Sequence, residues 1–387
     1  MATTIASLPV EILAEIFAST QFNRLVLSDR ARAEENTRAA IAVSQVCHQW
    51  RAVALGLPKL WANIAWGTHK AHRLGLVSAQ IERCRGLPML FNIVCPKDKS
   101  TQGLVHDSIA GHLRNAKHIF VKNCTTRILT TILTHDAPHL RSLHIEASSM
   151  IRLPAESRLP AKKFESLTKL MLVNVDIAFL NLICKAEIMG LGELQFPVHV
   201  FLHPFAPTLT SLVLFINVTA TDPSPNSPLV LPVLKFLSFI VPLEMSVLLA
   251  INMPRLEQLR IRAYSKNSFT AFLASLPTSW ALKPPTKLRI LDIIIACPQE
   301  EHTVMQHSSS LELMLSVFSN ISYMNWSGHT WDALMEFWGK RLGERGEDGK
   351  FNMPNLRGIE LDKKESHATL VDVLAGQRPE LSIVYKP

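Results

Sequence analysis

The first sixty or so residues carry apolar side chains at the spacing of two amphipathic helices. The first helix is predicted to start at Ser7, a capping residue, with Pro9 in the first turn, where no N–H is needed. Its apolar face is formed by Leu8, Ile12, Leu13, Ile16 and Phe17. The second helix, which Pro58 ends, has an apolar face of Ile41, Val43, Val46, Cys47, Trp50, Val53 and Ala54. The polar stretch 28–38 between them predicts a solvated loop or a short charged helix.

The rest of the chain repeats a short frame, apolar-x-x-apolar-x-apolar. Clear copies begin at Leu140, Leu167, Leu191, Leu209, Leu234, Leu256 and Leu288, and weaker copies at Ala116, Ile321 and Leu356. In five copies a proline stands two residues before the frame, at Pro138, Pro207, Pro232, Pro254 and Pro354. Each frame predicts a short strand, followed by a return segment that is helical in several units. The proline is expected to end the preceding helix and to stay outside the strand ladder, since it has no N–H.

Three segments outside the frame need separate interpretation. The apolar stretch 229–251 contains Lys235, Glu244 and two prolines, which favours a buried strand, a break and a buried helix over a membrane span. The stretch 326–341 predicts an aromatic-rich helix that packs in the core. The segment 221–228 is interpreted as a polar repeat loop, although its two Ser-Pro steps can also accept phosphate.

Composition excludes global disorder, because 48% of the residues are hydrophobic and only 19% are charged. The six cysteines form no C-x-x-C pair, which argues against zinc knuckles, thioredoxin-like redox sites and Fe–S frames. Their number is ordinary for a reducing compartment. The N-terminal residues up to Phe17 include Glu11 and Glu15 and no Lys or Arg, so a secretory signal is not predicted.

Catalytic and ligand-binding motifs are also absent from the sequence. It contains no G-x-S-x-G, G-x-G-x-x-G or H-E-x-x-H. The hydrophilic loop 343–350 fails as a phosphate loop because five residues separate Gly343 from Gly349 and Phe351 follows the lysine. His135, His139 and His144 lie close in sequence without a carboxylate or Cys to complete a metal site. We therefore expect no catalytic residue, no metal, no cofactor and no nucleic-acid partner.

Charge is unevenly distributed along the chain. Residues 67–163 contain 15 basic and 6 acidic side chains, whereas the regions before and after are close to neutral. The excess includes Arg83, Arg85, Arg114, Lys117, Lys122, Arg127, Lys162 and Lys163. Such a patch either attracts an acidic or phosphorylated partner or is a solvated outer surface.

Three blocks of the N-terminal region, taken in order, resemble an F-box, in particular the F-box-like proteins of fungi. They are Leu8-Pro9-x-Glu11-Ile12-Leu13, Val46-Cys47-x-x-Trp50-Arg51 and Pro58-x-Leu60-Trp61-x-x-Ile64. The resemblance covers about residues 7–66. The connection from about 20 to 40 is longer than in a compact F-box, and we interpret it as a solvent loop.

This resemblance implies that the N-terminal region binds the Skp adaptor of a cullin-RING ubiquitin ligase. Carried over by position, the residues that face the adaptor are Leu8, Pro9, Ile12, Leu13 and Ile16. Val46, Cys47 and Trp50 would pack the domain and border that contact. The alternative is a self-contained helical cap on the repeats that follow.

The repeated frame resembles a leucine-rich-repeat solenoid of irregular length, in which stacked units share one core. The asparagine of regular repeats appears in register only as Asn217. The predicted fold is therefore α/β: a small helical F-box over residues 1–66, then a curved leucine-rich-repeat-like solenoid with short parallel strands over 67–387. A parallel α/β fold of another kind is the alternative.

The predicted function is substrate recognition for a Skp–cullin–F-box ubiquitin ligase. The F-box would bind the Skp adaptor and, through it, a cullin, while the solenoid would bind a protein substrate. The chain would perform no chemistry itself and would act by raising effective concentration. We expect a cytoplasmic or nuclear location, away from membranes. The alternatives are a scaffold that delivers nothing for ubiquitination and a hydrolase-like α/β enzyme within residues 100–387.

Overall fold

The fold is described from a computed structural model of the chain. The described residues are 8–21, 30–66, 73–96, 99–152, 164–176, 186–192, 201–214, 229–241, 251–264, 285–295, 309, 312, 314, 317–328, 332–345, 349, 351–361 and 368–385. The chain divides into two compact units, Met1–Ala186 and Glu187–Pro387, and each is described by itself.

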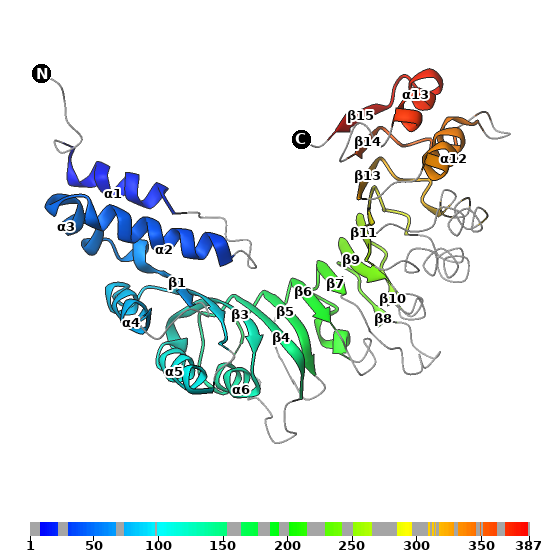
Figure 1. The fold of residues 1–387 in the computed structure, drawn as a ribbon. Helices are drawn as coiled ribbons and strands as arrows, with labels where there is room; N and C mark the ends of the chain where they lie inside the picture. The colour runs from blue at the N-terminus through cyan, green and yellow to red at the C-terminus, as the bar shows by residue number, and fades with distance from the viewer. Residues whose placement is uncertain are drawn as a thin grey trace, which may run out of the picture. The chain divides into compact units, whose positions relative to one another are not determined.

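The first unit begins with helices and continues with parallel strands (Figure 1). Its N-terminal helices are α1 (Val10–Ser19), α2 (Arg30–Gln45), α3 (His48–Gly56) and the 3₁₀ turn η2 (Pro58–Trp61). The strands are β1 (Asn63–Trp66), β2 (Met89–Val94), β3 (Ala116–Cys124), β4 (Ser142–Arg152) and β5 (Lys169–Asp176). Between them lie α4 (Arg73–Arg83), α5 (Lys99–Ala110), η3 (Leu113–Asn115) and α6 (Thr126–Thr134).

The helix α2 corrects the prediction for the region between the first two apolar blocks. Residues 30–40 are helical, so the helix is the correct one of the two alternatives for the polar stretch 28–38. Asn36 and Ala40 are 0% exposed, so the interpretation of residues 30–40 as a solvent loop is wrong. The predicted second helix is also two helices, because the chain breaks at Val46 and Cys47 before α3. The extended backbone of Cys47 caps α3, and its Sγ accepts a hydrogen bond from the N–H of Trp50 at 3.5 Å.

Strands β1 to β5 pair in parallel, each with the next in the sequence. Parallel strands need a crossover between them, and α4, α5 and α6 lie along one side of these strands in Figure 1. One face carries apolar core residues, including Ile119, Leu143 and Leu170 in one register row. The α/β prediction of N-terminal helices followed by short parallel strands is thus confirmed.

Buried polar side chains join the N-terminal helices to the first strand and to α4. Gln21 donates to the carbonyl of Asn36 at 3.2 Å and accepts from the Asn63 amide at 3.1 Å. Gln80 of α4, itself 0% exposed, donates to the Thr37 hydroxyl at 3.3 Å. A buried amide loses its hydration and needs such partners, so these bonds fix how α1, α2, β1 and α4 meet.

The face of β2 to β5 opposite the core carries two poorly hydrated histidines. His144 is 6% exposed and meets the Phe120 ring edge-on, with centroids 4.5 Å apart. Burial, with the charge of Lys122, lowers the pKa of His144 to about 4. Burial, with the charges of Lys117, Lys169 and Arg141, lowers the pKa of His118 to about 4 as well. Both rings are therefore neutral at pH 7.

These histidines predict a loss of stability in mild acid. The unfolded chain binds protons near pH 6.5 and the folded chain does not, so the free energy of unfolding falls as pH drops from about 6.5 to about 4. His144→Phe should remove about 2–3 kcal/mol of that change. Urea unfolding at pH 7 and pH 4.5 measures it. His203 is exposed, so His203→Gln should keep the full dependence of the unfolding free energy on pH. If His144→Phe kept that dependence as well, His144 would not be its source.

The second unit continues the same pattern of parallel strands. Its main strands are β6 (Ile188–Gly192), β7 (Ser211–Leu214), β9 (Phe236–Val241), β11 (Gln258–Ala263), β12 (Ile290–Ile295), β13 (Tyr323–Gly328), β14 (Gly358–Leu361) and β15 (Ser382–Tyr385). They pair in that order. A separate pair is formed by β8 (Leu229–Val230) and β10 (Ile251–Asn252). The unit also contains η4 (His203–Phe205), α12 (Asp332–Gly343) and α13 (Ala368–Gln377).

The repeated frame has a consistent structural meaning. In the copies that begin at Leu140, Leu234, Leu256 and Leu356, the first leucine donates its N–H to the carbonyl three residues earlier. The preceding proline therefore occupies the second position of a β-turn, where its fixed φ is favourable. This is a more specific role than ending a helix. The turn places the second and third apolar residues of each frame on the core side of the strand that follows.

Three frames differ from the prediction. The copy placed at Leu191 is shifted, because the buried residues at β6 are Ala186, Met189 and Leu191, while residues 193–200 lie outside the described residues. Two strands were not predicted. These are β1 and β2. The frame of β1 begins with Trp61 and Ile64, which also form the end of the N-terminal motif. The frame of β2 has a proline at its first position, where the other frames have another apolar residue.

A buried carboxylate connects three strands on the face opposite the core of the second unit. Asp292 of β12 has a side chain only 3% exposed. Its Oδ2 accepts from Gln258 at 2.8 Å and from Arg260 Nε at 2.9 Å, and its Oδ1 accepts from Asn325. The register places Arg260, Asp292 and Asn325 directly opposite one another on β11, β12 and β13. This row is a polar seam across three neighbouring strands.

The aromatic-rich segment 326–341 is partly described. Trp326 of β13 and Trp338 of α12 are buried, and their ring centroids lie 6.0 Å apart. The core placement predicted for them is confirmed, whereas Trp331 lies outside the described residues. The segment 221–228, Asn217 and most of 343–350 also lie outside. Among the described helices, none has the length and apolar content needed to cross a membrane.

Candidate functional site

The first helix, α1, has two rows of apolar side chains: one is buried in the domain core and the other is exposed. Its first intrahelical bond runs from the N–H of Leu13 to the carbonyl of Pro9 at 3.1 Å, and Pro9 is its N-cap. Proline suits the start of a helix because the first turn leaves its N–H groups unpaired. The helix ends at Ser19, whose hydroxyl donates to the carbonyl of Ile16 at 2.7 Å.

One stripe forms the core of the N-terminal region. Leu13 and Phe17 are both 0% exposed, and the Phe17 ring packs against Trp50 with centroids 5.0 Å apart. Trp61 is also 0% exposed and donates its indole N–H to the carbonyl of Ala54 at 2.8 Å. These contacts hold α1, α3 and η2 together, so the side of α1 that carries Leu13 and Phe17 is packed in the domain core.

The other stripe is not used by the core. Ile12 is 47% exposed and Ile16, one turn later, is 40% exposed. Val10 on α1 and Val46 before α3 are 53% and 58% exposed. Exposed branched apolar side chains on a supported helix face are typical of a surface that a protein partner covers.

The residues predicted to contact a partner fall into three groups. Ile12, Ile16 and Pro9 are exposed, and Leu8 is half-buried. Leu13 instead belongs to the core and offers no surface to a partner in this structure. Of the three bordering residues, Trp50 packs the domain as expected, whereas Val46 and Cys47 are exposed and pack little.

Sequence reasoning missed two features of the site. The exposure of Val10 was not predicted; it lies on the opposite side of the helix from Ile12 and so is separate from the surface of Ile12 and Ile16. The supporting role of α2 was also missed, since its segment was expected to be solvated. The sequence pattern that hints at α2 is the alanine-rich run that ends at Ala40, which fits beneath other helices.

Family comparison agrees with this geometry. Residues 5–65 match the F-box-like family. No curated protein matches the chain. The F-box-like domain thus comprises α1, α2, α3 and η2, and its last matched residues reach into β1.

The described part of the F-box-like domain contains exposed apolar side chains and no assembled catalytic group. Cys47 is exposed, but its thiol serves as the cap of α3. The neighbouring thiols are buried, and burial raises the pKa of Cys84 to about 11 and that of Cys95 to about 12, so both are protonated at pH 7. Among the described residues, no three His, Cys, Asp or Glu side chains come together to hold a metal.

Proposed function

We propose that the chain is the substrate-recognition subunit of a Skp–cullin–F-box ubiquitin ligase. The F-box-like domain would bind a Skp-type adaptor and, through it, a cullin. The parallel-strand region, a leucine-rich-repeat-like solenoid in this proposal, would hold a protein substrate. The observation that carries the proposal is that the helix matched to the F-box-like family keeps Ile12 and Ile16 at the surface.

The proposed mechanism needs no catalytic side chain in this protein. Binding a substrate and a ubiquitin-loaded enzyme in one complex raises their effective concentration and so accelerates transfer. Substrate contacts are proposed on the strand face opposite the core. In the second unit that face presents Tyr323 and Val384, each 53% exposed, together with Arg260, which is about one-third exposed. Aromatic and arginine side chains are the usual anchors of protein interfaces.

Binding of the full chain to a purified Skp-type adaptor tests the proposal. Titration calorimetry should show a one-to-one complex, and size-exclusion chromatography should then recover a ternary complex with a cullin. A reconstituted reaction with ubiquitin and its conjugating enzyme should modify a client captured by this chain. Absence of adaptor binding would overturn the proposal. Adaptor binding without ubiquitin transfer to any captured client would favour the scaffold function instead.

A further inference from the structure

Two arginines lie two residues apart on β11, on the strand face opposite the core of the second unit. Arg260 and Arg262 alternate along the strand with the buried Leu259, Ile261 and Ala263, so both side chains leave the sheet on the same side. β11 lies between β9 and β12 and pairs with both. The two arginines therefore share one place in the fold and differ in their neighbours.

Arg260 has a carboxylate partner within the chain. Its Nε and Nη2 each lie 2.9 Å from Oδ2 of Asp292, which stands directly opposite on β12. Its guanidinium also lies over the Phe236 ring, 5.5 Å from the ring centroid. The charge of Arg260 is thus neutralised, and its Nε–H has an acceptor.

Arg262 has no such partner. Its register neighbours are Ile240 on β9 and Ile294 on β12, so an apolar side chain stands where Asp292 stands beside Arg260. The Nε of Arg262 is buried and has no hydrogen-bond acceptor among the described residues, and the side chain forms no ion pair with them. A buried N–H group of a charged side chain is costly without an acceptor, so an acceptor from a bound partner would stabilise it.

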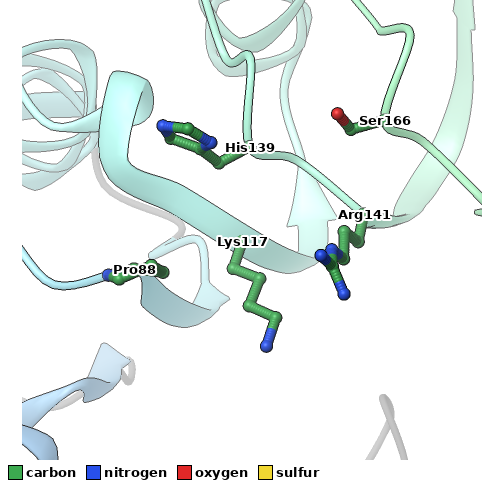
Figure 2. Close-up of a pocket in the computed structure, with 5 residues that line it drawn as sticks. All are labelled: Pro88, Lys117, His139, Arg141 and Ser166. Carbon is green, nitrogen blue, oxygen red and sulfur yellow. The ribbon is translucent and has the colours of Figure 1, made fainter.

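The unpaired cations of the first unit do not form a comparable site. Lys117 and Arg141 line a hollow at the edge where the strands begin, together with Pro88, His139 and Ser166. Figure 2 shows His139 and Ser166 on the other side of the strand starts from Lys117 and Arg141, so these donors do not converge on one group. Neither cation has a buried polar atom that lacks a partner, so water can satisfy both.

The surroundings of Arg262 select a single carboxylate. On the described part of this face of β9 to β13, it is the one cation without a carboxylate beside it. A phosphate group carries a second negative charge and needs further donors, and the nearby Asp292 would repel it. A carboxylate carries one charge and accepts two parallel hydrogen bonds from a guanidinium.

Apolar side chains surround this cation on both sides. Ile240 is 6% exposed, Ile294 is half-buried, and Tyr264, two residues after Arg262, is 44% exposed. Tyr323 of β13 adds a second exposed aromatic ring to the same face. Aromatic side chains are common anchors of protein interfaces. Because the apolar groups lie to both sides, they favour a segment that continues past Arg262 in both directions, with the carboxylate in its middle.

We propose that Arg262 binds the side-chain carboxylate of an aspartate or glutamate in a client protein, as Asp292 binds Arg260 within the chain. Apolar residues next to that acid would pack on Ile294 and Tyr264. The inference rests on the proposed function in taking the acidic segment to belong to a client. It gives the strand face opposite the core a defined chemical preference, for an acidic residue between apolar residues.

The test measures binding of the full chain to peptide pools by fluorescence anisotropy. In each pool a central position is flanked by mixtures of Leu, Ile, Val and Phe within a soluble Gly-Ser sequence, and both peptide ends are blocked. The central residue is glutamate in one pool and glutamine in the other. The glutamate pool should bind about tenfold more tightly or better, the range expected for one charged hydrogen-bond partner. A third pool has a central glutamine and a free C-terminal carboxylate.

Variants of Arg262 assign that preference to its side chain. Arg262→Gln should abolish the preference for glutamate, and Arg262→Lys, which keeps the charge and loses the planar fork, should recover part of it. Arg262→Glu should instead prefer a pool with a central lysine, a reversal that a merely structural role would not produce. Arg289, just before β12, is exposed, so Arg289→Gln changes the net charge equally and should keep the wild-type preference. Urea unfolding should show that Arg262→Gln is folded.

Three results would overturn the proposal: equal binding of the glutamate and glutamine pools, an unchanged glutamate preference in folded Arg262→Gln, or binding only of the pool with the free C-terminal carboxylate. Adaptor binding is measured on the same preparations. Intact adaptor binding without a glutamate preference refutes only the site at Arg262. A glutamate preference without adaptor binding refutes the ligase function and leaves a protein that binds acidic segments.

Discussion

Ile12→Asp should weaken binding of the full chain to a Skp-type adaptor by about 100-fold or more. Ile12 is half-exposed on α1, so the aspartate stays hydrated in the free protein and the fold is not disturbed. In the complex the charge would be covered by an apolar contact without a partner, which costs several times the thermal energy. Titration calorimetry with the purified adaptor measures the change.

Two controls separate loss of contact from loss of fold. Val384→Asp introduces the same charge at an equally exposed apolar residue of the second unit and should leave adaptor affinity unchanged. Ile12→Val, which keeps an apolar branched side chain, should bind within a few-fold of wild type. The free energy of unfolding of Ile12→Asp should stay within about 0.5 kcal/mol of wild type. Wild-type affinity in a folded Ile12→Asp protein would show that the partner uses another surface.

Asp292→Ala should destabilise the second unit by about 2–4 kcal/mol. The substitution removes the acceptor shared by Gln258, Arg260 and Asn325, and leaves these part-buried donors without it. Arg260 is about one-third exposed and regains some hydration, which keeps the loss below that of a fully buried ion pair. Urea unfolding followed by tryptophan fluorescence is a direct measurement, since Trp326 lies on the neighbouring strand.

Ser238→Ala is the matched control for that measurement. Ser238 is 1% exposed and lies in the same register row as Arg260 and Asp292, but its hydroxyl has no hydrogen-bond partner among the described residues. Removing it should cost less than about 1 kcal/mol. Asp292→Asn, which keeps the shape but weakens the acceptor, should fall between the two. Equal stability of Asp292→Ala and Ser238→Ala would show that the polar seam contributes nothing.

The sequence predicts the strands well where three apolar positions and a proline coincide. At Leu234 and Leu256 the proline fixes the turn and the spacing fixes the side of the sheet, so local chemistry decides the structure. At Leu191 several overlapping frames are possible, and only pairing with the neighbouring strand selects the earlier one. The strand β1 was not predicted, because Trp61 and Ile64 belong both to the F-box motif and to the apolar frame of this strand, and the motif accounted for them already.

The candidate site shows a different limit. Ile12, Leu13, Ile16 and Phe17 form one broad apolar stripe by periodicity, and helical spacing alone does not say which half is covered within the chain. The structure divides the stripe: Leu13 and Phe17 are buried, and Phe17 packs on Trp50 of α3, whereas Ile12 and Ile16 stay exposed. Likewise, α2 looks solvated from its charge, yet small and amide side chains on one side of it are buried by tertiary contacts.

The buried hydrogen bonds of Gln21, Asn63 and Gln80 link the F-box-like helices to β1 and α4. They therefore determine the shortest segment that could be moved into another protein with these contacts intact. A graft that ends at residue 66 would take the F-box-like helices without α4, and would leave β1 without its partner β2. A chimera that carries the chain through Val94 keeps both. A chimera that exchanges the F-box-like domain would therefore have to be joined after the first complete strand–helix–strand unit, and not at residue 65, where the family match ends.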